Sequence, residues 1–342
     1  MTAEAIEIAD FLKESENNLI VDVRAPIEFF KGHLYNAVNI PLFEDIERSE
    51  IGTLYKQQGK DSAVSRGMEI VSPKLDVFVK QVKALSTNKK VFVYCFRGGM
   101  RSNSFGWLMN KNELDAKILR GGYKAYRNHV LDYFAKERKL ILLGGKTGSG
   151  KTDVLKKLSG TYQVVDLEAI AHHKGSAFGS INEEKQKPQQ IFENTVYHKM
   201  NASDPAIPIL MEDEAQNIGY NKIPSALWTN MKQGTIIKLN IPLEARVQKL
   251  VNDYTTVDIK ALKNSVLKIA QQLGPQNTNL CLNYLDEGNL SDVARLSLHY
   301  YDKAYDFNYN KNKTQTIIQI ESETTDAEIN AKKVKQVLDS LK

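Results

Sequence analysis

Along the first third of the chain, segments with the apolar pattern of buried strands alternate with segments that have the apolar spacing of helices. Four short runs, β-branched or aromatic in character, predict buried strands at 18–24, 37–42, 89–95 and 116–120. Between and after them, apolar residues recur at helical spacing and predict helices at 74–86, 102–112 and 123–139. Alternating strands and helices are typical of a mostly parallel sheet with helices on both faces, so we expect an α/β domain here.

The pattern restarts after the charged stretch AKERK (135–139), which we interpret as a domain boundary. Strands are predicted at 139–145, 162–168, 207–214 and 234–241, and helices at 151–159 and 242–254. Beyond residue 255 the pattern is mostly helical, with one last strand expected at 315–320. We therefore expect an α/β domain at 1–136, a second α/β domain at 137–254, and a mostly helical C-terminal extension of the second domain at 255–342.

Composition narrows the class of protein. Hydrophobic residues make up 42% of the chain and charged residues 25%, which is ordinary for a soluble globular protein. The two cysteines, Cys95 and Cys281, provide neither a disulfide framework nor a Cys-x-x-Cys zinc motif, so we expect a reducing, cytoplasmic setting. The start of the chain does not read as a signal peptide, and no apolar run is long enough to cross a membrane. A net charge of +5 is compatible with a nucleic acid as partner.

The stretch YCFRGGMRS (94–102) places a cysteine between a predicted strand and a predicted helix. Ligand sites occupy such carboxyl ends of strands in parallel sheets. Two adjacent glycines let backbone N–H groups converge on one point, and the helix directs its positive end at that point. Arg97 and Arg101 add positive charge. These features favour a thiolate, so we predict that the pKa of Cys95 is lowered and that Cys95 is the catalytic nucleophile.

The segments on either side of this loop resemble the rhodanese family. DVRAPIEFFKGHLYNAVNIPL (22–42) is similar to the opening segment of that family, and LRGGYKAY (119–126) to its closing segment. The resemblance implies sulfur or selenium chemistry on the cysteine. The loop from Cys95 to Arg101 has seven residues, as in the phosphatases and arsenate reductases that share the fold, and this length favours a tetrahedral oxyanion. The residues expected around the anion are Phe96, Arg97, Gly98, Gly99, Met100, Arg101 and Ser102.

A second glycine-rich turn, GKTGSGKT (145–152), has the complete Walker A pattern. It follows a predicted strand and opens a predicted helix, which is the context in which this pattern binds a diphosphate. Its glycines let the backbone wrap the diphosphate, Lys151 reaches the outer phosphate, and Thr152 is placed to hold Mg²⁺. The pattern specifies a diphosphate and leaves the rest of the ligand open. The expected binding residues are Gly145, Lys146, Thr147, Gly148, Ser149, Gly150, Lys151 and Thr152.

Several further segments are specific to one family. IGTLYKQQGKDSA (51–63), CFRGGMRS (95–102), DLEAIAHHKGSAFG (166–179), MEDEAQNIG (211–219) and YYDKAYDF (300–307) resemble successive motifs of the bacterial tRNA 2-selenouridine synthase family. The resemblance implies a transferase that acts twice on 2-thiouridine at the wobble position of the tRNAs for Lys, Glu and Gln. Geranyl diphosphate alkylates the sulfur, and selenophosphate then replaces the S-geranyl group with selenium. No covalently bound cofactor is implied. An enzyme that supplies selenophosphate is a further expected partner.

Supporting roles are expected for polar residues near the two turns. The strand at 207–214 resembles a Walker B strand, and its terminal carboxylates are candidates for metal binding or for a base. A prenyl chain also needs apolar surface, for which Phe178, Trp228 and Met231 are candidates. Lys174 stands where the family pattern has Arg. The supporting candidates are Asp22, Arg24, His172, His173, Lys174, Glu212, Asp213 and Glu214.

Three other functions remain open on the residues alone. The seven-residue loop is also compatible with a phosphatase or arsenate reductase fused to a nucleotide-binding region, although Tyr94 stands where such enzymes have His before the cysteine. A persulfide-carrying sulfurtransferase coupled to ATP hydrolysis is the second alternative. The third is an RNA-binding protein with an inactive P-loop.

Overall fold

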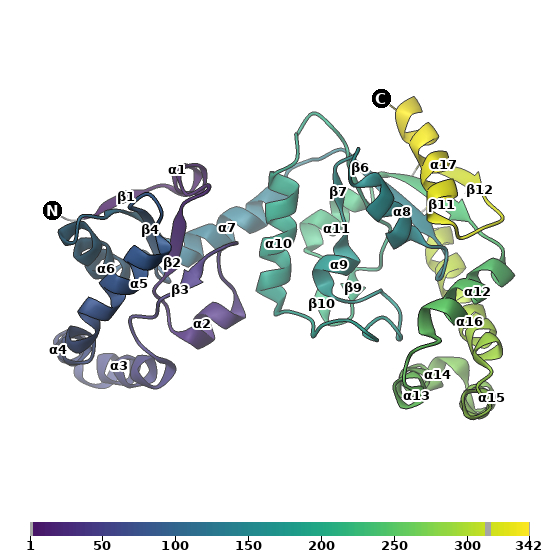
Figure 1. Ribbon diagram of the computed structural model, residues 1–342, viewed down its shortest axis with the longest axis horizontal. Helices are drawn as coiled ribbons and strands as arrows, with labels where there is room; N and C mark the ends of the chain where they lie inside the picture. Colours follow the sequence, from purple (N-terminus) through teal and green to yellow (C-terminus); the bar gives the residue numbers. More distant parts are fainter. Residues whose placement is uncertain (1–2, 312–315, 342) are drawn as a thin grey trace. The chain divides into compact units, whose positions relative to one another are not determined.

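The computed structural model describes residues 3–311 and 316–341, with the side chains of 308–311 left out. The chain divides into two compact units. Unit 1 comprises Met1–Tyr133 and Pro188–Asn194, and unit 2 comprises Phe134–Lys187 and Thr195–Lys342. Each unit contains a parallel sheet with packed helices, so the predicted α/β class, with a rhodanese-like first part and a P-loop-type second part, is confirmed (Figure 1).

The sheet of unit 1 has five parallel strands in the order β1-β5-β4-β2-β3. The central strand β4 pairs with β5 on one side and with β2 on the other, where Val93 lies opposite Val21. Apolar side chains from these strands form the core together with Phe105 and Met109 of α6. The strands are β1 (Glu4–Ile6), β2 (Leu19–Asp22), β3 (Val38–Asn39), β4 (Lys90–Tyr94) and β5 (Asp115–Leu119).

The three helices predicted in unit 1 are present as α5, α6 and α7, and the unit has further helices that were not predicted. Neither α3 nor α4 was predicted, because α3 buries none of its side chains and α4 buries only Ala63 and Gly67, so the apolar periodicity is weak. The helices are α1 (Ile8–Glu14), α2 (Pro26–Lys31), α3 (Asp45–Gln58), α4 (Lys60–Val71), α5 (Leu75–Leu85), α6 (Met100–Lys111) and α7 (Gly122–Phe134), with a 3₁₀ turn at Ser72–Lys74.

The sheet of unit 2 also has five parallel strands, in the order β12-β11-β6-β8-β7. The strand predicted at 162–168 is only two residues long, because Asp166 accepts a hydrogen bond from the N–H of Ala169 and caps a helix there. The sheet strands are β6 (Leu140–Gly145), β7 (Val164–Val165), β8 (Ile209–Glu212), β11 (Thr235–Asn240) and β12 (Ile317–Glu321), and β9 (Asn217–Ile218) forms a hairpin with β10 (Asn221–Lys222). Position 315 of the predicted last strand lies outside the described residues.

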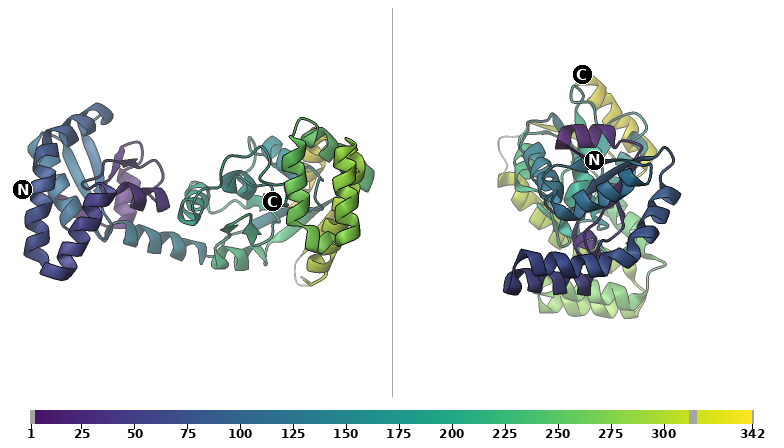
Figure 2. Two further views of the ribbon diagram at one scale, coloured as in Figure 1. Left: turned by 90° about the horizontal axis from the view of Figure 1, so that it is seen from below. Right: turned by 90° about the vertical axis from the view of Figure 1, so that its left-hand side faces the viewer.

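Helices cover the sheet of unit 2 and extend beyond it. Helix α8 packs against α17, and α12 packs against α16. Figure 2 shows α12–α16 gathered into one helical bundle. The helices are α8 (Lys151–Leu158), α9 (Leu167–Ala171), α10 (Gln189–Asn201, which begins in unit 1), α11 (Ser225–Met231), α12 (Leu243–Tyr254), α13 (Ile259–Lys268), α14 (Ala270–Leu273), α15 (Pro275–Asp286), α16 (Leu290–Lys311) and α17 (Ala327–Ser340). None of the helices in the described ranges is both long and apolar enough to span a membrane.

Candidate functional site

Cys95 lies at the carboxyl end of the central strand of unit 1, directly after β4 and five residues before α6 begins at Met100. Its side chain is 3% exposed. The N–H of Gly99 donates a hydrogen bond to Sγ at 3.3 Å, and the hydroxyl of Ser102 lies 3.2 Å from Sγ. Burial disfavours the thiolate. The contacts with Ser102 and the charge of Arg101 outweigh burial, so the pKa of Cys95 is lowered, in the predicted direction.

The closing segment of unit 1 holds the backbone of this loop. The N–H of Tyr123 donates to the carbonyl of Cys95 at 2.8 Å, and the N–H of Lys124 donates to the carbonyl of Phe96 at 3.0 Å. Gly122 has a φ of +59°, and a Cβ there would lie 2.2 Å from the carbonyl oxygen of Cys95. Only glycine allows this approach, so the glycine pair of LRGGYKAY lets the closing segment pack directly against the cysteine loop.

Three arginines, Arg48, Arg97 and Arg101, line the pocket above the thiol. Arg101 donates from Nη1 to Oε2 of Glu28 at 3.0 Å, and Nε of Arg48 lies 3.6 Å from the same oxygen. The pocket has a volume of about 430 Å³. The charge and size of this pocket suit a tetrahedral oxyanion. Arg97 is exposed, with its guanidinium over the ring of Phe96.

Sequence reasoning missed Arg48 and gave Glu28 no role. Arg48 lies on α3, far from the loop in sequence, so no local pattern marks it. Asp22 and Arg24, which were expected to support the site, form a buried ion pair with Nη2 and Oδ2 2.6 Å apart. Arg24 also donates to the carbonyl of Gly32 at 2.5 Å. Neither residue borders the thiol pocket, so the structure gives this pair a packing role.

The second turn joins β6 to α8 in unit 2, in the order that the Walker pattern predicts. Gly148 and Gly150 have φ values of +79° and +78°, a conformation that glycine adopts without strain. Lys151 is partly buried, with 14% of its side chain exposed, and its Nζ donates to the carbonyl of Gly145 at 3.0 Å. Burial lowers and the neighbouring carboxylates raise the pKa of Lys151, and the net shift is upward, so this side chain carries a positive charge.

Carboxylates gather beside Thr152. Its hydroxyl lies 2.9 Å from a carboxylate oxygen of Glu168 and 2.9 Å from one of Glu212. Glu168, Glu212 and Glu214 each offer an oxygen within 4.8 Å of the others. Burial, and then the neighbouring carboxylates, raise the pKa of Glu168 to about 8 and that of Glu212 well above its usual range. A buried set of hard oxygen donors beside a P-loop hydroxyl fits Mg²⁺.

Asp213 takes no part in this carboxylate cluster. Its N–H donates to the carbonyl of Leu143, and its carboxylate lies against Gly144. Glu168, in contrast, was missed as a site residue. A signal for it existed in the sequence, since Glu168 follows the short strand β7 at the same carboxyl edge of the sheet as the P-loop.

A buried arginine fixes the P-loop from α12. Arg246 is 3% exposed and donates from Nη1 to the carbonyl of Thr147 at 3.2 Å. It also forms a two-pronged pair with Asp302 of α16, at 2.8 and 2.7 Å. Lys146 also pairs with a carboxylate of α16, since its Nζ lies 2.9 Å from Asp306. Sequence reasoning missed Arg246, because a single arginine in an amphipathic helix has no distinguishing pattern.

The segment after α9 borders the carboxylates. A Cβ at Gly175, where φ is +67°, would lie 2.7 Å from Glu214 and 2.8 Å from Glu168. Lys174 borders the P-loop cleft and pairs with Glu183 at 3.2 Å. His172 lies 3.3 Å from Glu184. His173 has its Nδ1 buried with no hydrogen-bond partner among the described residues, and burial lowers its pKa. Neither histidine borders the cleft.

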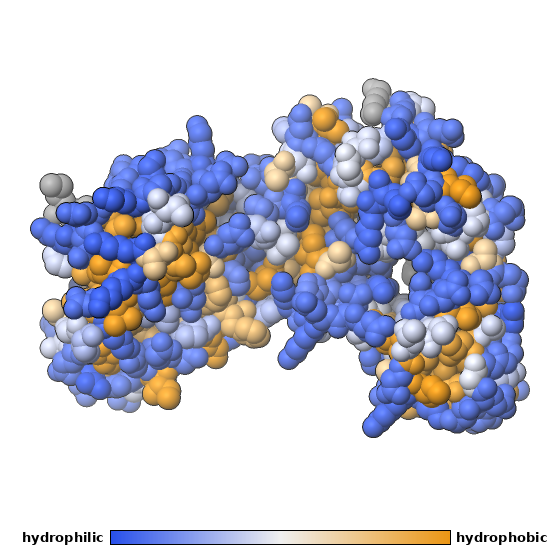
Figure 3. Space-filling model, in the orientation of Figure 1, coloured by the Kyte–Doolittle hydropathy of each residue, from blue (hydrophilic) through white to orange (hydrophobic). Residues whose placement is uncertain are grey.

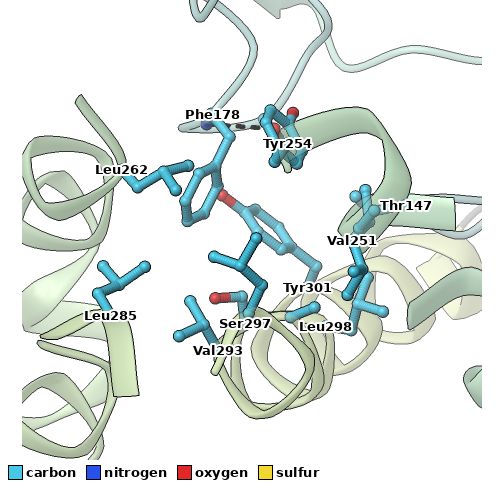
Figure 4. A pocket seen from close by; sticks show the side chains of 14 residues that line it. Thr147, Phe178, Val251, Tyr254, Leu262, Leu285, Val293, Ser297, Leu298 and Tyr301 are labelled. Carbon is cyan, nitrogen blue, oxygen red and sulfur yellow. Dashed lines mark hydrogen bonds between the residues drawn. The ribbon is translucent and has the colours of Figure 1, made fainter. Parts of the chain in front are cut away.

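The P-loop opens into a cleft of about 660 Å³ with a mixed polar and apolar lining. Trp228, Leu250 and Tyr254 are among its apolar lining residues. Behind it lies a small apolar cavity of about 40 Å³, which shares Thr147, Leu250, Tyr254 and Tyr301 with the cleft (Figure 4). Phe178 points into that cavity, whereas Met231 is buried in α11, so the three expected apolar residues do not come together.

Comparisons with known proteins agree on both units. Residues 138–336 match the family described as the tRNA 2-selenouridine synthase AAA domain, and residues 5–129 match the rhodanese-like domain. The tRNA 2-selenouridine synthase of Shewanella loihica is 33% identical over 88% of this chain and 89% of its own. That of Shewanella woodyi is 33% identical over 88% and 90%. That of Shewanella frigidimarina is 36% identical over 76% of this chain and 71% of its own.

Proposed function

The chain belongs to the family of tRNA 2-selenouridine synthases, and we propose that it converts 2-thiouridine of tRNA to 2-selenouridine in two steps at its two glycine-rich turns. In the first step geranyl diphosphate alkylates the sulfur. In the second step selenophosphate supplies the selenium that replaces the S-geranyl group. The substrates proposed are the wobble bases of the tRNAs for Lys, Glu and Gln. The observation that carries the proposal is the pair of different anion sites: a thiol pocket for a tetrahedral oxyanion and a P-loop for a diphosphate.

The alkylation step is assigned to the P-loop. The thiouridine sulfur attacks C1 of the geranyl group, the C–S bond forms, the C1–O bond breaks, diphosphate leaves, and N3 of the base loses its proton. Backbone N–H groups of the loop and Nζ of Lys151 bind the diphosphate and stabilise the charge that develops as it leaves. Thr152, Glu168 and Glu212 would hold Mg²⁺, which neutralises diphosphate charge when bound.

The hydrocarbon part of the donor is placed against the apolar lining residues of the P-loop cleft. Trp228, Leu250 and Tyr254 line the same cleft as the loop. The cavity behind it, about 40 Å³, is too small for ten carbons, so the chain lies along the cleft instead.

The selenium step is assigned to Cys95. The thiolate attacks the phosphorus of selenophosphate, the S–P bond forms, the P–Se bond breaks, and hydrogen selenide anion leaves. The selenide attacks C2 of the modified base, the C2–S bond breaks, and geranylthiol leaves after taking one proton. Water then attacks the phosphorus, the S–P bond breaks, hydrogen phosphate leaves and the thiolate is restored. This hydrolysis releases one proton, which balances the proton taken up by geranylthiol. No oxidant or reductant is consumed.

The residues of the cysteine loop support each part of this step. The N–H of Gly99 supports the thiolate, the start of α6 offers N–H groups to the phosphate oxygens, and Arg101 adds positive charge. Ser102 stabilises the thiolate both before attack and when sulfur leaves phosphorus. A seven-residue loop suits this phosphoryl transfer better than transfer of a bare selenium atom.

The test is an RNA anticodon stem-loop that contains 2-thiouridine, incubated with geranyl diphosphate and selenophosphate. Liquid chromatography with mass spectrometry of the nucleosides should show S-geranyl-2-thiouridine first and 2-selenouridine later. Absence of both products would reject the proposal. The same loop length favours a phosphatase as second candidate, and rapid turnover of p-nitrophenyl phosphate without any RNA product would support that instead.

A further inference from the structure

A large apolar groove lies on unit 1, beside the thiol pocket. Its walls come from α3, α4 and α6, and its volume is about 1030 Å³. Ile51, Val64, Met68 and Trp107 contribute to a lining that is mostly apolar. Figure 3 shows this apolar surface between hydrophilic residues over the region of α3, α4 and α6. Met68 is 65% exposed and Trp107 is 46% exposed, so large apolar side chains face solvent here.

Ion pairs join α3, which forms one wall of the groove, to the helical segments that follow it. Lys74 lies 2.6 Å from Glu47, and Arg66 lies 2.6 Å from Glu50. The stretch IGTLYKQQGKDSA (51–63), which neither proposed half-reaction has used, supplies much of one wall.

The groove continues into the thiol pocket. Arg48, Met100 and Arg101 border both spaces. A ligand that reacts above Cys95 can therefore extend into the groove without crossing the protein. Lys56 and Lys60 also border the groove, and together with Arg48 they give its rim a positive charge, which complements the phosphates of an RNA.

We infer that this groove binds the geranyl chain of S-geranyl-2-thiouridine during the selenium step, an inference that rests on the proposed function. In that step C2 of the base has to reach selenide formed at Cys95, and the S-geranyl group is attached to the same carbon. A ten-carbon chain cannot remain in water without cost, and an adjoining apolar groove removes it from water. The groove is therefore a second prenyl site, used by the intermediate and by the leaving geranylthiol, whereas the P-loop cleft serves the diphosphate donor.

The first test uses the two tryptophans of the chain, Trp107 in the groove and Trp228 in the other unit. In a full-length Trp228→Phe protein, all tryptophan emission comes from Trp107. Stem-loop RNA that carries S-geranyl-2-thiouridine should shift this emission to shorter wavelength, and RNA that carries S-methyl-2-thiouridine should not. Equal emission with the two RNAs would overturn the groove assignment, whatever the chemical activity of the protein.

The second test measures substrate preference. Met68→Asp should lower the ratio of kcat/KM for S-geranyl RNA over S-methyl RNA at least tenfold. Ile46→Asp is the matched control, since Ile46 is on α3, is 84% exposed and does not border the groove, so the ratio should not change. An unchanged ratio in Met68→Asp would refute the groove. Failure of the unsubstituted protein to form selenouridine from S-geranyl RNA would instead refute the proposed function, while the emission test still judges the groove.

Sedimentation of the same proteins tests whether a second copy of the chain occupies the groove instead of the geranyl chain. If the groove were an interface between two copies, Met68→Asp would convert a dimer to a monomer, and that result would also overturn the proposal. We expect the same sedimentation for the unsubstituted protein, Met68→Asp and Ile46→Asp.

Discussion

The hydroxyl of Ser102, in the first turn of α6, lies 3.2 Å from Sγ of Cys95, directly after the strand β4. Ser102 is fully buried, and its hydroxyl also donates to the carbonyl of Gly99 at 3.1 Å. The serine therefore has a fixed position beside the sulfur. Its contact is the leading favourable influence on the thiolate, against the opposing effect of burial.

Ser102→Ala should therefore shift the pH dependence of the selenium step. The pKa of Cys95 is lowered, so the thiolate is present above that pKa and is lost as pH falls through it. Without the hydroxyl the thiol pKa rises, and activity should begin at higher pH and be about tenfold lower near neutrality, since a hydrogen bond to a charged group contributes about 1.5 kcal/mol or more. The pH profile of Cys95 alkylation by iodoacetamide checks this directly. Identical profiles for the two proteins would contradict the assignment.

Lys151→Ala should weaken the alkylation step. Lys151 Nζ lies at the P-loop, and a charge-assisted contact to the outer phosphate contributes about 1.5–3 kcal/mol. The affinity for geranyl diphosphate should fall about tenfold or more, as measured by titration calorimetry. Lys157→Ala is the control, because Lys157 is exposed on the same helix and pairs with Glu328. Loss of ATP binding with intact geranylation would instead assign the P-loop to a nucleotide.

Contiguous motifs made the two turns predictable from sequence. Cys95 with Arg101, and Gly145 with Lys151 and Thr152, lie within seven or eight residues of each other, and local backbone geometry alone imposes their pattern. The strands that lead into both turns are buried, so their apolar runs were also clear.

Residues brought in from distant elements were not predictable in the same way. Arg246 reaches the P-loop from α12, and Arg48 reaches the thiol pocket from α3. Each is one charged residue on a helix whose pattern is set by other positions. The groove was missed for a related reason: Met68 and Trp107 are half-exposed, so they follow neither a core nor a surface period.

Glu168→Gln should have opposite effects with and without Mg²⁺. Oxygens of Glu168, Glu212 and Glu214 lie within 4.8 Å of one another, so above about pH 8, where Glu168 is ionised, its replacement by Gln removes one charge and relieves repulsion. The melting temperature without a divalent cation should rise by a few degrees. The cation-bound form loses a ligand, so the stabilisation that Mg²⁺ gives to the unsubstituted protein should be largely lost. Thermal unfolding at several Mg²⁺ concentrations measures both effects, and an unchanged Mg²⁺ response would rule out this cluster as the metal site.

Arg246→Ala should destabilise unit 2 and impair alkylation together. The substitution leaves Asp302 and the carbonyl of Thr147 without a strong donor, and breaking a buried pair in this way costs about 3 kcal/mol or more. Arg246→Lys keeps the charge but loses the two-pronged geometry, so it should restore stability only in part. Hydrogen exchange of α12 and of the P-loop gives the local readout. Equal protection in the unsubstituted and Ala proteins would contradict a role for Arg246 in holding the loop.

Cys95→Ser separates the two half-reactions. The alkylation step needs no thiol, because the thiouridine sulfur is the nucleophile and diphosphate is the leaving group. The selenium step needs the thiolate, and a serine hydroxyl in the same loop stays protonated near neutral pH. The variant should therefore bind tRNA and accumulate S-geranyl-2-thiouridine, while 2-selenouridine falls at least a hundredfold.

Arg101→Ala should give a partial form of the Cys95→Ser phenotype, because it removes charge from the thiol pocket and raises the thiol pKa. Glu28→Gln provides the comparison, since it keeps Arg101 but removes the carboxylate to which Nη1 donates. Mass spectrometry of nucleosides after reaction with both donors measures every product in one experiment. Normal 2-selenouridine from Cys95→Ser would refute a catalytic thiol. Loss of both products would mean that the thiol pocket and the P-loop act as one site, because an alkylation step independent of Cys95 would then be excluded.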